Sequence, residues 1–413
     1  MPNTTLTADV IAKAALAVLD NEFGWLNKMH RVYEDEYSET VNGYKKGATI
    51  SIRRPADFTV RTGPVAAAQD VIEGKVPLTI DQQIGVDFKF TSTELTLNVN
   101  QLTERVIKPA MINIVNHMGN DLLTQAYSGV YNFVGTPGQA INSFADFARG
   151  PERLDDMAVP SSDRYSVMVP NDFWNMVGSQ TTLGGSRASD GAYRKGTLGD
   201  VGGISTYMTQ VMPRHTVGVA TGTPLVNGAA QSVTYDTAKN TWTQTLNADG
   251  WTASITGILK AGDVFTVAGV FAVNPKTKAV LAHLQQFVVT ADVTSTAGGV
   301  GNPVISPPII VSGPHQTVSA APADNAAITV VGTGGQIFNQ SLMMHKNAMA
   351  LAVVPMEKPE GAVNVSRHSH NGISVRLIPT YDGVNDVSNW RLDLLYGRKL
   401  IDPRLATRMS GTT

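Results

Sequence analysis

The longest regular pattern of hydrophobic and polar positions covers residues 100–134. Hydrophobic residues recur there at intervals of three and four, the spacing of one face of an α-helix. They are Leu102, Val106, Ile107, Ala110, Met111, Ile114, Val115, Met118, Leu122, Ala126 and Val130. A helix of roughly 30 residues would be on the order of 45 Å long. We expect Pro109 to bend it or mark its first regular turn, and Gly135 to end it.

In the segment before the helix, hydrophobic residues recur at every second position. Hydrophobic residues alternate there with polar ones, as expected for a long strand: Leu78, Ile80, Ile84, Val86, Phe88 and Phe90. A partner strand is expected at residues 48–53, and residues 63–77 between the two are rich in Gly, Pro and Ala. The two arms predict an extended β-hairpin with a protruding loop.

Shorter patterns predict further elements on both sides of a central region. Helices are expected at residues 7–20, 138–157 and 173–177, and strands at 165–169, 204–211, 350–354, 361–366, 372–379 and 390–396. The helix at 138–157 should direct Ile141, Phe144, Ala145, Ala148 and Leu154 inward. The strand at 390–396 is expected to be the final core strand, and residues 179–203 an exposed loop.

The central region, residues 218–344, has a composition of its own. It contains only nine charged residues, no arginine and no glutamate, which indicates a domain boundary. Short β-rich runs at 232–235, 251–255, 263–267, 270–273, 286–289 and 327–331 predict an inserted all-β domain, a small barrel or sandwich. Its expected core residues are Phe265, Val267, Val270, Phe271, Leu281, Phe287 and Val289. Residues 236–249 are expected to project as a polar loop.

Composition narrows the class of protein. A chain of 413 residues exceeds what one hydrophobic core usually supports, so two or more domains are expected. The formal net charge of −2 gives no global attraction to nucleic acid or to an anionic membrane. The absence of cysteine excludes disulfides and thiolate chemistry. We see no secretory signal, and the long helix is too polar to cross a membrane.

No set of residues predicts a catalytic, cofactor-binding or metal site. His368 and His370 lie in a polar segment expected to be a turn, without a spaced third ligand, and His117 is alone on the long helix. The glycine-rich stretches lack the Gly-x-x-x-x-Gly-Lys-Ser/Thr pattern of a phosphate-binding loop. Acidic runs at 34–36 and 155–156 are typical of solvated surfaces or helix ends. A basic cluster of Arg187, Arg194 and Lys195 could contact phosphate or simply line a loop.

The order of these elements resembles a known family. The motifs that carry the resemblance are Lys260-Ala-Gly-Asp-Val-Phe-Thr-Val-Ala-Gly269, Lys278-Ala-Val-Leu-Ala-His-Leu-Gln-Gln-Phe-Val-Val289, Met168-Val-Pro-Asn-Asp-Phe173 and Leu394-Leu-Tyr-Gly397. With the element order they resemble the major capsid proteins of tailed phages, and most closely the coat proteins of short-tailed phages that bear an inserted β-barrel domain. The resemblance implies an α+β fold of the HK-ninety-seven type.

The resemblance also implies a division of the chain. The expected parts are an N-terminal arm (1–40), an extended β-hairpin loop with peripheral-domain strands (41–92), a spine helix of the peripheral domain (93–137), the first part of an axial domain (138–217), the inserted all-β domain (218–344), and closing strands of the axial and peripheral domains (345–413). By the same analogy, residues 236–249 should touch a neighbouring capsomer.

The implied function is that of a structural subunit without enzymatic activity or cofactor. It would be made in the host bacterial cytoplasm and would form hexamers and pentamers of itself in the icosahedral head of a double-stranded DNA phage. The implied partners are a scaffolding protein, a portal at one vertex, DNA contacted non-specifically on the inner face, and a decoration protein. Two alternatives are the shell protein of an encapsulin-like nanocompartment and an enzyme with an accessory β domain. The inserted domain favours the virus.

Overall fold

The computed structural model describes residues 24–31, 40–41, 44–45, 48–61, 63–65, 68–91, 106–181, 198–359, 365–370 and 373–412. The chain divides into two compact units, each assembled from separate segments. The first unit comprises residues 1–51, 77–122 and 349–399, and the second comprises residues 52–76, 123–348 and 400–413. Helices and strands are mixed in the chain, which confirms the predicted α+β class.

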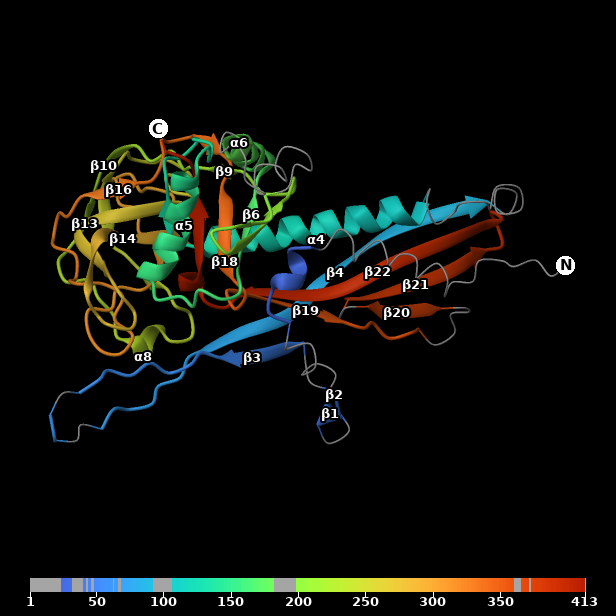
Figure 1. Ribbon diagram of the computed structural model, residues 1–413, viewed down its shortest axis with the longest axis horizontal. Coiled ribbons are helices and arrows are strands. Elements are labelled where there is room, and N and C mark those ends of the chain that lie inside the picture. The colour runs from blue at the N-terminus through green and yellow to red at the C-terminus, as the bar shows by residue number, and fades with distance from the viewer. Residues whose placement is uncertain are drawn as a thin grey trace. The chain divides into compact units, whose positions relative to one another are not determined.

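The first unit is a β-sheet with a helix along it (Figure 1). Its strands are β3 (Thr49–Arg53), β4 (Lys75–Thr91), β19 (Met349–Val354), β20 (Ser366–His370), β21 (Ile373–Asp382) and β22 (Val387–Leu400). They pair in the order β20-β21-β22-β4-β3, and β19 also pairs with β22. A short helix, η1 (Leu26–Lys28), and a ribbon of β1 (Thr40–Val41) and β2 (Tyr44–Lys45) come before this sheet in the chain.

The long helix is α4 (Lys108–Gly129), and Pro109 lies in its first turn as expected. The predicted apolar face is confirmed within the described residues, because its members from Ile107 to Val130 are at most 6% exposed. The predicted end is wrong. The helix stops at Gly129, and residues 133–134 form a strand, β5 (Phe133–Val134), that pairs with a distant strand and so satisfies its backbone groups in a sheet.

The long strand β4 pairs with β22 along most of its length, for example Ile84 with Leu394. The register slips by one residue at Gly397, where β4 carries an extra residue, as in a β-bulge. A Cβ atom on Gly397 would lie 2.3 Å from the carbonyl oxygen of Thr79. Only glycine therefore allows the two backbones to approach this closely, and the Tyr-Gly motif of the sequence marks this place.

The second unit contains a six-stranded sheet of mixed direction, with hydrogen-bonded order β5-β23-β18-β6-β8-β7. Its other strands are β6 (Arg164–Met168), β7 (Asp200–Val201), β8 (Ile204–Met208), β18 (Ser341–His345) and β23 (Ala406–Met409). The chain thus continues past β22 into one more buried strand, so the prediction that β22 is the final core strand is wrong. Apolar side chains of α5 (Phe144–Asp156) and α6 (Pro170–Thr181) share a hydrophobic core with this sheet.

The helix α5 begins six residues later than the pattern predicts. Ser143 caps it, since its hydroxyl oxygen accepts a hydrogen bond from the Asp146 N–H at 3.2 Å. This start changes which side chains face inward. Phe147 and Leu154 are buried, whereas Phe144 is 55% exposed, contrary to the prediction.

A second sheet in this unit is formed by residues of the charge-poor region, in the order β11-β15-β14-β13-β16. Its strands are β11 (Gln244–Thr245), β13 (Val264–Val273), β14 (Val280–Val289), β15 (Val304–Ser306) and β16 (Ile328–Val330). Two smaller pairs are β9 (His215–Thr216) with β17 (Ile337–Phe338) and β10 (Gly222–Val226) with β12 (Ala248–Trp251). Two short helices are α8 (Tyr235–Ala238) and η3 (Pro403–Leu405).

The predicted core of this region is confirmed for Phe265, Val267, Val270, Phe287 and Val289, which are fully buried. The strand β13 is irregular between Thr266 and Phe271, where Gly269 has a φ of 78°. This bulge breaks the alternation, and Phe271 is therefore 38% exposed instead of buried.

Residues 232–235 do not form the expected strand, because the helix α8 begins at Tyr235. The following segment was expected to project, and this is wrong for two of its largest side chains. Trp242 and Leu246 are 5% and 0% exposed, and Trp242 packs on Tyr235 and Ile310. Burial of these side chains outweighs the polar character of their neighbours.

Several predictions concern residues outside the described ranges. These are the helix at 7–20, the acidic run at 34–36, the basic cluster of Arg187, Arg194 and Lys195, and most of the loop at 179–203 and of the strand at 361–366. Among the helices of the described ranges, none is both long enough and apolar enough to cross a membrane.

Candidate functional site

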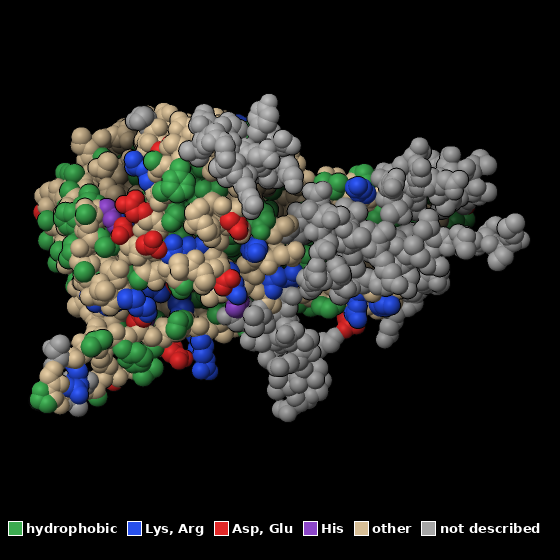
Figure 2. Space-filling model, in the orientation of Figure 1, with side chains coloured by type: hydrophobic (Ala, Val, Ile, Leu, Met, Phe, Trp, Pro, Cys, Tyr) green, Lys and Arg blue, Asp and Glu red, His purple; other side chains and the backbone are tan. Residues whose placement is uncertain are grey.

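An extended loop between β3 and β4 (residues 54–74, hereafter the extended loop) carries four strongly exposed hydrophobic side chains. Phe58, Val60, Val65 and Val71 are 55%, 96%, 81% and 65% exposed. Figure 2 shows hydrophobic side chains on this protruding loop at the lower left. Several exposed hydrophobic side chains on one loop are typical of an interaction surface. The extended loop is therefore the candidate interaction surface of the chain.

Hydrogen bonds between its two arms give this loop a defined shape. At the base, the Arg54 N–H donates to the carbonyl oxygen of Gly74 at 2.9 Å. Further out, the side-chain oxygen of Gln69 accepts from the N–H and the hydroxyl of Thr59, both at 2.9 Å. The Gln69 amide group donates back to the Thr59 carbonyl oxygen at 2.6 Å. These three bonds, which we call the brace, connect positions that strand pairing does not hold.

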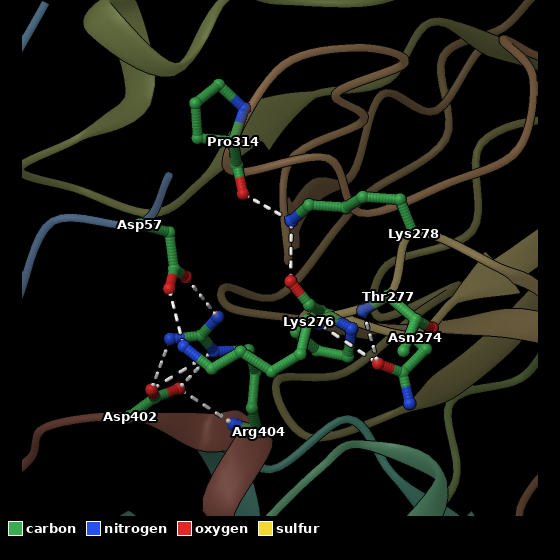
Figure 3. A network of polar contacts seen from close by, with 9 residues as sticks. Asp57, Asn274, Lys276, Thr277, Lys278, Pro314, Asp402 and Arg404 are labelled. Carbon is green, nitrogen blue, oxygen red and sulfur yellow. Dashed lines mark hydrogen bonds and ion pairs between the residues drawn. The ribbon is translucent and has the colours of Figure 1, made fainter. Parts of the chain in front are cut away.

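Asp57 attaches the loop to the body of the second unit (Figure 3). Its carboxylate accepts a hydrogen bond from Lys276 Nζ at 2.6 Å and lies 3.7 Å from Arg404 Nη1. The Asp57 side chain is 14% exposed. Burial alone would raise the pKa of Asp57, but the hydrogen bond from Lys276 and the charge of Arg404 outweigh burial and lower it. The carboxylate is thus ionised at neutral pH.

Of the two cations that face Asp57, Arg404 is held by side-chain contacts of its own, and Lys276 is held at its backbone. Arg404 pairs with Asp402, with its Nη2 and Nε atoms 2.7 Å and 3.0 Å from the two carboxylate oxygens. The Lys276 backbone N–H donates to Asn274 Oδ1 at 2.9 Å, which shapes the turn between β13 and β14. Arg404 is thus preorganised as one side of a socket for a carboxylate, and the ammonium group of Lys276 completes this socket when it binds Asp57.

Trp242 provides an aromatic contact at the same place. The guanidinium carbon of Arg54 lies 5.1 Å, and that of Arg404 5.9 Å, from the centre of the Trp242 ring system, within the range of cation–π attraction. The Lys75 N–H donates to Asn240 Oδ1 at 3.1 Å. We refer to Arg54, Asp57, Trp242, Lys276 and Arg404 together as the loop anchor.

A second polar network is fully buried. Arg408, which is 1% exposed, donates to the carbonyl oxygens of Val130 and Gly262, both at 2.8 Å, and to Gln340 Oε1 at 3.2 Å. Close by, His215 Nε2 and Asp263 Oδ1 are 2.8 Å apart, and both side chains are buried. Burial lowers the pKa of Arg408 because charged groups lose solvation in the interior. This network joins the end of α4 and β23 to the charge-poor region.

The candidate residues from the sequence do not converge on a site. His368 and His370 lie in the strand β20 and not in a turn, and His117 is exposed on α4. Asp155 is at the end of α5 and pairs with Arg164 at 2.6 Å. Among the described residues, no group of three His, Cys, Asp or Glu side chains is placed to hold a metal ion.

The loop anchor was not found from the sequence. Asp57 and Lys276 are 219 residues apart, and neither belongs to a recognisable motif. Two partial indications were present in the sequence, the isolated lysines in a charge-poor region and the Asp402-Pro403 pair at the start of η3.

Comparison with known proteins agrees with a structural role. The family described as P22 coat protein, gene protein 5, matches residues 36–411. The major capsid protein of Acyrthosiphon pisum secondary endosymbiont phage 1 is 24% identical over 383 residues, which is 88% of this chain and 89% of that protein. A solved structure from Mycobacterium phage Che8 is 13% identical, with a TM-score of 0.49, over 93% of this chain and 89% of that one. The CUS-3 coat protein I-domain is 28% identical, with a TM-score of 0.19, and the match covers 27% of this chain and 96% of that domain.

The family match covers most of the chain and settles the class of protein, a phage coat protein. The chain belongs to the P22 coat protein family, and its function is that of a phage major capsid protein. The resemblance stated from the sequence is thereby confirmed.

Proposed function

We propose that this capsid protein forms the icosahedral head of a tailed double-stranded DNA phage by assembling into hexamers and pentamers of itself. Its membership of the P22 coat protein family and its similarity to a phage major capsid protein support the proposal. Further partners, proposed from the family resemblance, are a scaffolding protein, a portal at one vertex, packaged DNA contacted without sequence specificity, and a decoration protein. The site of action is the virion.

One observation carries the assembly proposal, the exposed hydrophobic surface of the extended loop. Val60 and Val65 are almost fully exposed, yet the loop that presents them is braced and anchored. A loop that only connected two strands would gain nothing from such fixed apolar side chains. Covering them with a neighbouring subunit gains about 1.5–3 kcal/mol for each fully buried side chain.

A double substitution of Val60 and Val65 by serine tests this role. The subunit should keep its melting temperature, because neither side chain contributes to a core, but it should fail to form closed shells in negative-stain micrographs. Val384→Ser is the matched control, since Val384 is 92% exposed in a turn of the first unit. Shells at wild-type yield from the double variant would contradict the role of the loop. Uniform monomer from the wild-type chain by light scattering would contradict shell formation itself.

We also infer that the region predicted at residues 218–344 is an inserted all-β domain that folds independently as far as Gln340. From Ser341 the chain forms β18, which pairs with β6 and β23 in the six-stranded sheet. The support is a hydrophobic cluster whose buried members all lie between Val226 and Ile328, and a five-stranded sheet built only from this region. Expressed alone, the fragment should unfold cooperatively and show dispersed amide resonances. A fragment without a cooperative transition would show that the region depends on the surrounding chain.

A further inference from the structure

The arms of the extended loop lack strand pairing over most of their length. The described residues between Arg53 and Lys75 belong to no strand. Fixing each residue of such a segment costs about 1–2 kcal/mol of conformational free energy, which backbone ladders usually offset. Side-chain contacts must therefore supply the order of this loop.

Of the contacts that order the loop, the one made by Asp57 has the largest effect on its position. It is the only described acidic side chain of the loop with an ion pair to the region between β13 and β14, since it reaches Lys276 at 2.6 Å. The Asp57 side chain is 14% exposed and that of Lys276 is 66% exposed, so this charged hydrogen bond is stronger than a neutral one but partly screened by solvent. The brace lies directly beyond it, starting at Thr59. Fixing Asp57 therefore also fixes, through the brace, the direction of the hydrophobic tip of the loop.

The surroundings of Asp57 fit one carboxylate. Lys276 and Arg404 face it, and Lys278 and His315 lie close enough to interact with it electrostatically. Lys278 is occupied by the carbonyl oxygen of Pro275 at 2.6 Å, and Arg404 is oriented by Asp402. Lys276 has no hydrogen-bond acceptor for its Nζ atom in the described residues other than Asp57. The socket is therefore complete only when the loop is docked.

We propose that Asp57, Lys276 and Arg404 form a latch that fixes the extended loop to its own subunit before assembly and so sets the direction of its hydrophobic tip. The occupant of the socket is the Asp57 carboxylate of the same chain. This proposal deepens the assembly role given above and rests on it for its biological meaning, but the latch itself is a property of the free subunit. Its test can therefore fail while shell formation stands.

Limited proteolysis of purified free subunits tests the latch. Asp57→Asn and Lys276→Met should each raise the rate of cleavage within residues 58–71 by roughly two- to fivefold, the factor that corresponds to the loss of one ion pair with an exposed lysine. Asp70→Asn is the matched control, because Asp70 is on the same loop and exposed, and it should leave the rate unchanged. Equal cleavage of the Asp57→Asn and Asp70→Asn subunits would overturn the proposal.

The double variant Asp57→Asn/Lys276→Met separates a shared latch from two unrelated effects. If both residues act through one contact, its loop should be cleaved no faster than that of either single variant. Multiplied rates would show that the two side chains act independently, which refutes the latch.

A mixing experiment decides whether the loop docks on its own subunit. Each single variant retains one intact half of the pair. In an equimolar mixture, docking within one chain leaves every latch broken, so the assembly rate should equal the mean of the two variants. Docking on a neighbour would restore some complete pairs and accelerate assembly. A rate above that mean would therefore overturn the proposed occupant and identify a neighbouring copy instead.

Discussion

Replacing Arg408 by methionine should destabilise the second unit strongly. The side chain is fully buried and donates to three acceptors: the carbonyl oxygens of Val130 and Gly262 and the side-chain oxygen of Gln340. Methionine fills a similar volume without any donor. The two carbonyl oxygens belong to the backbone and remain buried after the substitution.

Two effects oppose each other in this variant. Each buried acceptor left without a donor costs about 1–3 kcal/mol. Removal of a buried charge gives some of this back, since burial already disfavours the charged form of Arg408. With three acceptors against one charge, we expect a net loss of roughly 3–5 kcal/mol in the free energy of unfolding. This is a large part of the typical stability of a domain, about 5–15 kcal/mol.

Urea-induced unfolding of the free subunit, followed by tryptophan fluorescence, measures this loss. Trp242 and Trp251 are both buried in the second unit and report on it. Arg408→Lys should lose less, roughly 2 kcal/mol, because an ammonium group can still serve one or two acceptors. Arg214→Met is the control, as Arg214 is exposed. A loss below about 1 kcal/mol for Arg408→Met would refute the reasoning and show that relief of the buried charge offsets the lost bonds.

Three further predictions concern other parts of the chain. Met111→Asp places a charge at a fully buried position of α4 at a cost of several kcal/mol and should yield insoluble chains, whereas Asn113→Asp, on the exposed face, should stay soluble. Gly397→Ala should lower the melting temperature, because its Cβ atom would lie 2.3 Å from the Thr79 oxygen. Burial lowers the pKa of His283 and of His315 to about 4, so the unfolded chain binds protons more readily and stability should fall as the pH drops from about 6.5 to 4. Glutamine at either position should reduce that fall by roughly 1–2 kcal/mol, as measured by urea unfolding at both pH values.

The sequence correctly predicted the elements whose hydrophobic pattern depends only on residues close together in the chain. The buried face of α4 follows from a spacing of three and four, and the strand β4 follows from alternation, because each pattern depends only on the geometry of one element. The predicted helix boundaries were wrong where a distant strand or an N-cap residue determines them. Residues 133–134 pair with β23, and Ser143 delays the start of α5.

Irregular backbone and charge pairs between distant residues could not be predicted from the sequence, because both depend on the tertiary fold. One bulge near Gly269 turns Phe271 outward, although its hydrophobicity alone predicts burial. The loop anchor combines residues from the extended loop, from the turn after β13 and from the region of η3. No local pattern links charges that only the tertiary fold brings together.

The energetics of the extended loop favour its ordering before assembly. Fixing about twenty residues at the moment of contact would cost on the order of 20–40 kcal/mol. Four exposed side chains, Phe58, Val60, Val65 and Val71, could return only about 6–12 kcal/mol on burial. Burial of these four side chains alone would not offset the cost of ordering a disordered loop. When the anchor and the brace have already ordered the loop, most of that cost is met by the folding of the subunit, and burial of the tip then contributes directly to the contact between subunits.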